Sequence, residues 1–140
     1  IEDDDLAVAV CAACTVTDPR VGALAAIDGN PLPPAPKWTH NLTARWGVPV
    51  GSGEFFVFTD WVYRSEVNFF LYESIEFTGK SLLEGGLRAG YLWNDGDYEV
   101  AAYGRNITDQ ERIVGGIDFN NLTGFINEPR TLGVEFTARF

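Results

Sequence analysis

Apolar and polar residues alternate with a period of two along several segments of this chain. In residues 37–48, Trp38 and Trp46 would share one face, with Thr43 and Arg45 on the other. Because successive side chains of a β-strand point to opposite faces, this period predicts a strand with one apolar and one polar face. Helical periodicity, with apolar residues three and four positions apart, is hard to find anywhere in the chain.

The same alternation predicts five strands of about ten residues, a usual length for a strand that crosses a membrane. The strands cover residues 37–48, 54–64, 82–92, 97–107 and 132–140. In the second strand, Phe56 and Phe58 blur the contrast between the faces. The last strand is the clearest, and its apolar face would carry Leu132, Val134, Phe136, Ala138 and Phe140.

The connections between these strands alternate in length. Residues 49–53 and 93–97 are short turns, whereas residues 65–81 and 108–130 are long. Tight turns at one end of the sheet and long loops at the other are typical of transmembrane β-barrels. Ten residues tilted near 45° rise about 23 Å, close to the height of the apolar band of such a barrel. We therefore expect an all-β, membrane-spanning fold, although five strands are too few to close a barrel.

A soluble β-sandwich is the alternative interpretation of the same pattern. One face of each strand would then be apolar because it packs in a core between two sheets. In that case the Trp and Tyr residues could stack on sugars, and the chain would be a carbohydrate-binding module.

Composition and charge limit the classes of partner. The chain has 10 Lys and Arg against 20 Asp and Glu, a net charge of −10, which disfavours nucleic acid. Much of the excess lies in residues 1–36, which form an acidic segment before the first strand. The chain contains no Met and begins at Ile1. We expect it to be a piece of a longer protein, the alternative being a mature chain trimmed of a leader.

Cys11 and Cys14 form a C-x-x-C pattern that could bind a metal or act in redox chemistry. A zinc site needs about four ligands, and the only further Cys or His in the chain is His40, on a predicted apolar face. A small disulfide in an oxidising compartment is therefore the favoured interpretation. The acidic run at residues 2–5 could bind calcium, but it lacks the Gly and terminal Glu of a defined calcium loop, so a solvated run is the favoured interpretation. We expect no metal and no cofactor.

Candidate ligand-binding residues lie on the polar strand faces. We expect no enzyme activity, because the chain shows no nucleophile with a convincing base, although the paired carboxylates of a glycosidase could lie among its acidic residues. Most charged residues on the polar faces would make structural contacts. The candidates for contact with a ligand are Arg45, Asp60, Arg64, Arg88 and Arg105.

Three stretches resemble segments of TonB-dependent outer-membrane receptors. They are "GNPLPPAPKWTHNLTARW" (29–46), "YEVAAYGRNITDQE" (98–111) and "EPRTLGVEFTARF" (128–140). The first is similar to the Leu-Pro-x-Ala-Pro-Lys-x segment that enters a late strand, the second to the aromatic-Gly-x-Asn-Leu-Thr-Asp segment, and the third to the closing strand. Tyr103 stands where the family often has Trp, and Ala138 where an aromatic residue is common.

The resemblance implies a 22-stranded barrel of the bacterial outer membrane, filled by a plug domain. Residues 37–140 would be its last five strands, and residues 1–36, 65–81 and 108–130 its extracellular loops. It further implies import of a scarce solute, most often a ferric siderophore. The implied partners are lipid, the remainder of the barrel and plug, and the TonB complex, which would contact an N-terminal region absent from this sequence. Phe136 and Phe140 would form the signal for membrane assembly.

Overall fold

A computed structural model of the chain describes residues 6–118 and 121–139, and within these ranges it contains strands and no helix. The all-β prediction is confirmed, and the sheets are antiparallel. None of the described residues belongs to a helix long and apolar enough to cross a membrane. The chain divides into two compact units. The sheet unit comprises residues 40–63, 83–110 and 128–140, and the loop unit comprises residues 1–39, 64–82 and 111–127.

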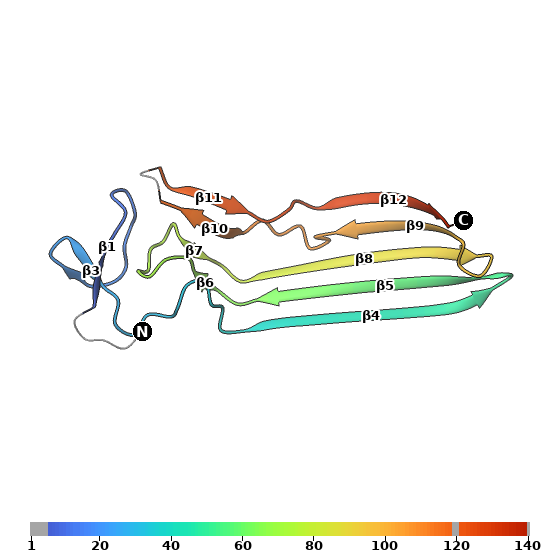
Figure 1. Cartoon of the computed structure of the whole chain (residues 1–140), viewed down its shortest axis with the longest axis horizontal. Coiled ribbons are helices and arrows are strands. Elements are labelled where there is room, and N and C mark those ends of the chain that lie inside the picture. Colours follow the sequence, from blue (N-terminus) through green and yellow to red (C-terminus); the bar gives the residue numbers. More distant parts are fainter. Residues whose placement is uncertain (1–5, 119–120, 140) are drawn as a thin grey trace. The chain divides into compact units, whose positions relative to one another are not determined.

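Five long strands form one sheet in which each strand neighbours the next long strand in the sequence (Figure 1). They are β4 (Thr39–Val50), β5 (Gly53–Arg64), β8 (Leu82–Trp93), β9 (Tyr98–Arg105) and β12 (Thr131–Ala138). All five correspond to predicted strands, with ends that differ by a few residues. The predicted position of Phe140 at the end of the last strand lies outside the described residues.

Two tight turns and two long connections join these strands, as the alternation of lengths predicted. In the turn between β8 and β9, Asn94 and Asp95 both have positive φ, at 54° and 56°. Two successive residues of this kind match the right-handed twist of a hairpin, and Asn, Asp and Gly adopt the conformation most readily. The sequence Asn-Asp-Gly at residues 94–96 therefore sets this turn locally.

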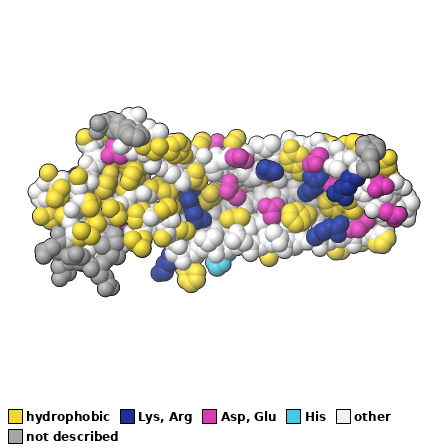
Figure 2. Space-filling model, viewed as in Figure 1, with side chains coloured by type: hydrophobic (Ala, Val, Ile, Leu, Met, Phe, Trp, Pro, Cys, Tyr) yellow, Lys and Arg dark blue, Asp and Glu magenta, His cyan; other side chains and the backbone are white. Residues whose placement is uncertain are grey.

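The two faces of the sheet differ in chemistry. One face, the apolar face, carries the alternating hydrophobic side chains, and these are largely exposed: Leu132 is 73% and Val134 76% exposed. The other face, the polar face, carries acidic and basic side chains, which are interspersed over the sheet in the view of Figure 2. Phe56 lies on the polar face, only 5% exposed, beneath the guanidinium of Arg45, whose Cζ is 5.3 Å from the ring centroid. Its burial explains an aromatic residue at a position that alternation assigns to polar side chains.

The loop unit is built from the segments that the sequence predicted as loops, and it contains short strands. A three-stranded sheet has the order β1 (Ala7–Ala9), β3 (Leu24–Ala26), β2 (Arg20–Val21). Two hairpins pair β6 (Val67–Asn68) with β7 (Thr78–Gly79) and β10 (Ile113–Ile117) with β11 (Thr123–Ile126). These strands are two to five residues long, too short for alternation to be recognised in the sequence. The buried core is Cys11, Ala25, Ile27, Tyr72 and Phe77.

Candidate functional site

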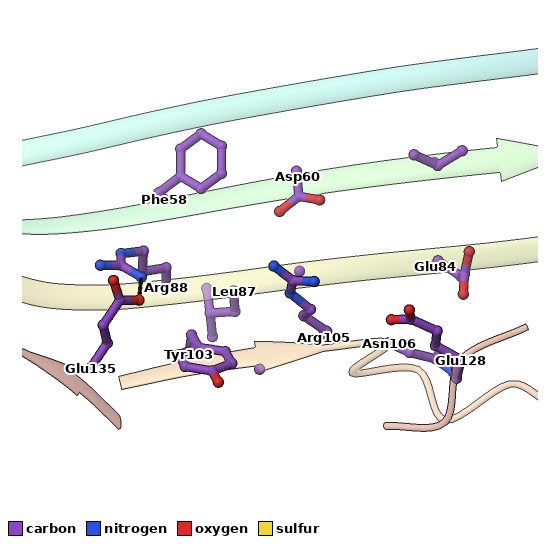
Figure 3. A pocket seen from close by; sticks show the side chains of 13 residues that line it. Phe58, Asp60, Glu84, Leu87, Arg88, Tyr103, Arg105, Asn106, Glu128 and Glu135 are labelled. Atoms are coloured by element: carbon purple, nitrogen blue, oxygen red, sulfur yellow. Dashed lines mark hydrogen bonds and ion pairs between the residues drawn. The ribbon is translucent and has the colours of Figure 1, made fainter. Parts of the chain in front are cut away.

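The polar face of the sheet unit contains a hollow of about 510 Å³. The hollow lies over β5, β8, β9 and β12, and its labelled side chains are drawn in Figure 3. Charged residues from four strands meet there because residues of one parity on neighbouring strands share a face. The charged and aromatic residues that line it are Phe58, Asp60, Glu84, Arg88, Tyr103, Arg105, Glu128 and Glu135.

Arg88 is held by two carboxylates at one side of the hollow. Its guanidinium on β8 pairs with Glu99 on β9, and its Nη1 lies 2.8 Å from Oε2 of Glu135 on β12. The Nε of Arg88 also donates to Glu99, at 3.1 Å. One cation therefore crosslinks three strands, and its charge is already compensated. Of the predicted ligand-binding residues, Arg88 is thus better explained as a structural ion pair.

Two other predicted residues, Arg45 and Arg64, do not line the hollow. Arg45 pairs with Glu54 at 2.7 Å, on the neighbouring strand. Arg64, at the end of β5, belongs to the loop unit, where its Nη2 donates to the carbonyl of Ile113 at 3.2 Å. Its guanidinium also lies over the ring of Phe69, 5.9 Å from the centroid. The sequence placed all of the candidates on one face, but the structure separates these two from the hollow.

Asp60 and Arg105 are the two predicted residues that face the hollow without an ion-pair partner. Among the described residues, no oppositely charged side-chain atom lies within 4.0 Å of either group. A Cβ at position 86 would overlap the Asp60 carboxylate, so this group lies directly over Gly86 of β8. Arg105 follows Gly104, which pairs with Leu87, and is therefore in register beside Gly86. In Figure 3 the Asp60 and Arg105 side chains extend toward one another across β8.

Asn106 belongs to the 98–111 stretch that carries the resemblance but was not among the predicted ligand-binding residues, and it joins the segments at one end of the hollow. It is 6% exposed and has a φ of 45°, a conformation that Asn tolerates better than most residues. Its Nδ2 donates to the carbonyls of Gln110 and Glu128, at 3.0 and 2.9 Å, and its Oδ1 accepts from Thr108 Oγ1 at 3.0 Å. Alternation placed Asn106 inside the predicted strand 97–107, whereas the observed strand ends at Arg105, and Glu128 lies outside every predicted strand.

Two of the three stretches that carry the family resemblance meet at this point. Asn106 and Asp109 come from residues 98–111, and Glu128 and Arg130 from residues 128–140. Besides the bond from Asn106 to the Glu128 carbonyl, Arg130 pairs with Asp109 at 2.9 Å. The motif residues therefore have a structural role, which is to fasten the start of β12 to the end of β9.

An aromatic cluster occupies the turn end of the apolar face. Trp93 stacks on Tyr91 and Tyr98, with centroids 6.0 and 5.6 Å apart, and Phe136 lies 6.3 Å from Trp93. On the same face and at the same end, Trp46 of β4 and Phe55 of β5 meet edge to face, with ring centroids 6.4 Å apart. Aromatic rings of this kind favour a boundary between an apolar phase and water. Phe136, predicted as part of the assembly signal, is a member of this cluster.

The loop unit contains the predicted disulfide and two groups with shifted pKa values. Cys11 and Cys14 are bonded to each other, and the Tyr72 hydroxyl accepts a hydrogen bond from the Cys11 amide at 3.2 Å. Burial raises the pKa of Tyr72 above its ordinary value of 10.0. Bonds from the amide and hydroxyl of Thr15, both 2.8 Å, lower the pKa of Glu76 below 4.5. These contacts bind the segment around residue 15 to the tip of the β6–β7 hairpin.

The described residues contain no group of three or more His, Cys, Asp or Glu side chains arranged to hold a metal ion. Residues 2–5, the acidic run considered for calcium, lie outside the described part of the chain. A scan against protein-family models, a search of curated proteins and a search of solved structures each found no match to this chain.

Proposed function

We propose that this chain is the C-terminal barrel segment of a TonB-dependent receptor of the bacterial outer membrane. The receptor would import a scarce solute, a ferric siderophore in the first instance. In this proposal the apolar face of the sheet contacts lipid and the polar face lines the lumen, and residues 1–36, 65–81 and 108–130 act as extracellular loops that help to capture the solute. Energy coupling through TonB would belong to a part of the receptor that this sequence does not contain.

The observation that carries the proposal is the exposed apolar face of a five-stranded antiparallel sheet. Soluble monomers rarely expose contiguous apolar surface of this kind. Leu42, Trp46, Leu132, Val134 and Phe136 are all more than half exposed, and all point away from the ion pairs. In a lipid bilayer the same face would be buried, and the polar lumen would solvate the opposite face. The aromatic cluster at the turn end supports this assignment, since transmembrane barrels carry aromatic residues at the interfaces.

The direction of the edge strands also supports a larger barrel. In an antiparallel sheet of five strands, the two edge strands, β4 and β12, run in the same direction. An all-antiparallel barrel can include this sheet only if an odd number of further strands lies between the two edges. The 22 strands implied by the resemblance meet this condition, because 22 minus five is 17. Copies of this chain alone would meet β12 to β4 in parallel, a pairing that transmembrane barrels of this class do not use.

The proposal is tested by the environment of the Trp side chains in the purified chain. Trp46 on β4, Trp61 on β5 and Trp93 on β8 all belong to the apolar face of the sheet. The fourth Trp of the chain, Trp38, belongs to the loop unit. In micelles of dodecyl maltoside, we expect a brominated form of the detergent to quench most of the Trp fluorescence, because the apolar face contacts the alkyl chains. A monomeric, cooperatively melting β-protein in detergent-free buffer would contradict the proposal and favour the carbohydrate-binding sandwich.

A further inference from the structure

In the hollow on the polar face, the Asp60 carboxylate and the Arg105 guanidinium are not paired with each other. Asp60 on β5 and Arg105 on β9 approach from opposite sides of β8 (Figure 3). Two strand spacings separate the backbones of β5 and β9, about 10 Å. Both side chains line the same hollow of about 510 Å³, which can receive a small group that carries one positive and one negative charge.

The other charges around the hollow disfavour a simple anion. Four carboxylates line it, from Asp60, Glu84, Glu128 and Glu135, against the two guanidinium groups of Arg88 and Arg105. Arg88 is already compensated by Glu99 and by Glu135, which is one of these four carboxylates. An anion alone would therefore meet an excess of negative charge.

A simple cation would also leave a group unsatisfied. It could bind the Asp60 carboxylate, but the Arg105 guanidinium, with its five N–H donors, would have no anionic partner in the ligand. A carboxylate on the ligand can accept two parallel bonds from Arg105, while an ammonium group donates to Asp60. The rings of Phe58 and Tyr103 also line the hollow and offer apolar contact to the rest of such a ligand.

We propose that Asp60 and Arg105 bind an amino-acid-type zwitterion, either as a free solute or as part of a larger one. The ammonium group lies against Asp60 and the carboxylate against Arg105, and the absence of a side chain at Gly86 leaves room for the Asp60 carboxylate. This inference rests on the proposed function in one respect, because it takes the polar face to be the lumen wall that meets the imported solute.

The test compares three probes that share one aromatic body. L-Phenylalanine carries both charges, phenethylamine only the cation, and 3-phenylpropionate only the anion. Isothermal titration of the full chain in dodecyl maltoside micelles should show saturable binding of phenylalanine. Each singly charged probe should bind at least about tenfold more weakly, because one charge-assisted hydrogen bond is lost.

Variants connect the binding to the two residues. Asp60→Asn should weaken phenylalanine to the level of 3-phenylpropionate, and Arg105→Gln should weaken it to the level of phenethylamine. Gly86→Ala should weaken phenylalanine while keeping both charges, because a methyl group displaces the Asp60 carboxylate. Arg45→Gln is the matched control on the same face, outside the hollow, and should leave binding unchanged.

Equal affinity for all three probes would overturn the inference, and so would unchanged phenylalanine binding in both Asp60→Asn and Arg105→Gln. Absence of saturable phenylalanine binding would do so as well. None of these results bears on the quenching of Trp fluorescence by brominated detergent. If phenylalanine does not bind but the brominated detergent still quenches Trp fluorescence, only this inference is contradicted. If the detergent does not quench Trp fluorescence, the proposed function is contradicted.

Discussion

Leu42 and Thr43 offer a direct test of the proposal that the apolar face of the sheet contacts lipid. They are adjacent on β4, an edge strand, and point to opposite faces. Leu42 on the apolar face is 63% exposed, and Thr43 on the polar face is also exposed. We compare Leu42→Arg with Thr43→Arg, so that the same side chain is introduced at neighbouring positions on the same strand.

The magnitude depends on the surroundings of the apolar face. An Arg on the lipid face of a transmembrane barrel costs about 2–4 kcal/mol at the bilayer midplane and about 0–1 kcal/mol near the interface. Leu42 is the fourth residue of the 12-residue strand β4. In the proposed barrel it would lie between the interface and the midplane, so we expect an intermediate cost of about 2 kcal/mol. That corresponds to a folding constant reduced by about thirtyfold. Thr43→Arg should change stability by no more than about 0.5 kcal/mol, as is usual for an exposed site in water.

The measurement is a guanidinium titration of each variant in dodecyl maltoside micelles, followed by circular dichroism of the β-sheet. The expected result is a lower midpoint for Leu42→Arg and a midpoint close to that of the parent chain for Thr43→Arg. Equal midpoints for the two variants would refute the reasoning, because the two faces would then have equivalent surroundings.

Three further predictions concern other parts of the chain. Asn106→Ala should destabilise the sheet unit by about 1–2 kcal/mol, because the part-buried carbonyls of Gln110 and Glu128 lose a donor, and chemical denaturation should show little effect for the exposed control Asn121→Ala. The bonds from Thr15 lower the pKa of Glu76, so their contribution to the loop unit should be present above pH 4.5 and lost as the pH falls through the folded pKa. Amide exchange around Thr15 should show this loss, and Glu76→Gln should remove the dependence on pH. Deleting Phe140 should impair assembly in a bacterial outer membrane far more than ligand affinity, and normal assembly would contradict its role as a signal.

The five long strands could be predicted from the sequence because their determinants are local. Period-two alternation extends over eight to twelve residues in each strand, and Asn94, Asp95 and Gly96 favour a tight turn without help from distant residues. The opposite faces follow from the same alternation. The short strands of the loop unit could not be predicted, because two to five residues carry too little pattern and pair only when distant segments meet.

The candidate site shows the same division between local and distant determinants. The sequence alone placed Arg45, Asp60, Arg88 and Arg105 on one face, since the parity of a position decides its face. It could not decide which of these charges pair, because pairing depends on the register between strands and on the lateral distance between side chains. Only the tertiary structure joins Arg88 to carboxylates on two other strands, β9 and β12, and leaves Asp60 and Arg105 on strands either side of β8. The sequence therefore determined the two faces of the sheet, and the packing of the strands decided where on the polar face a ligand could bind.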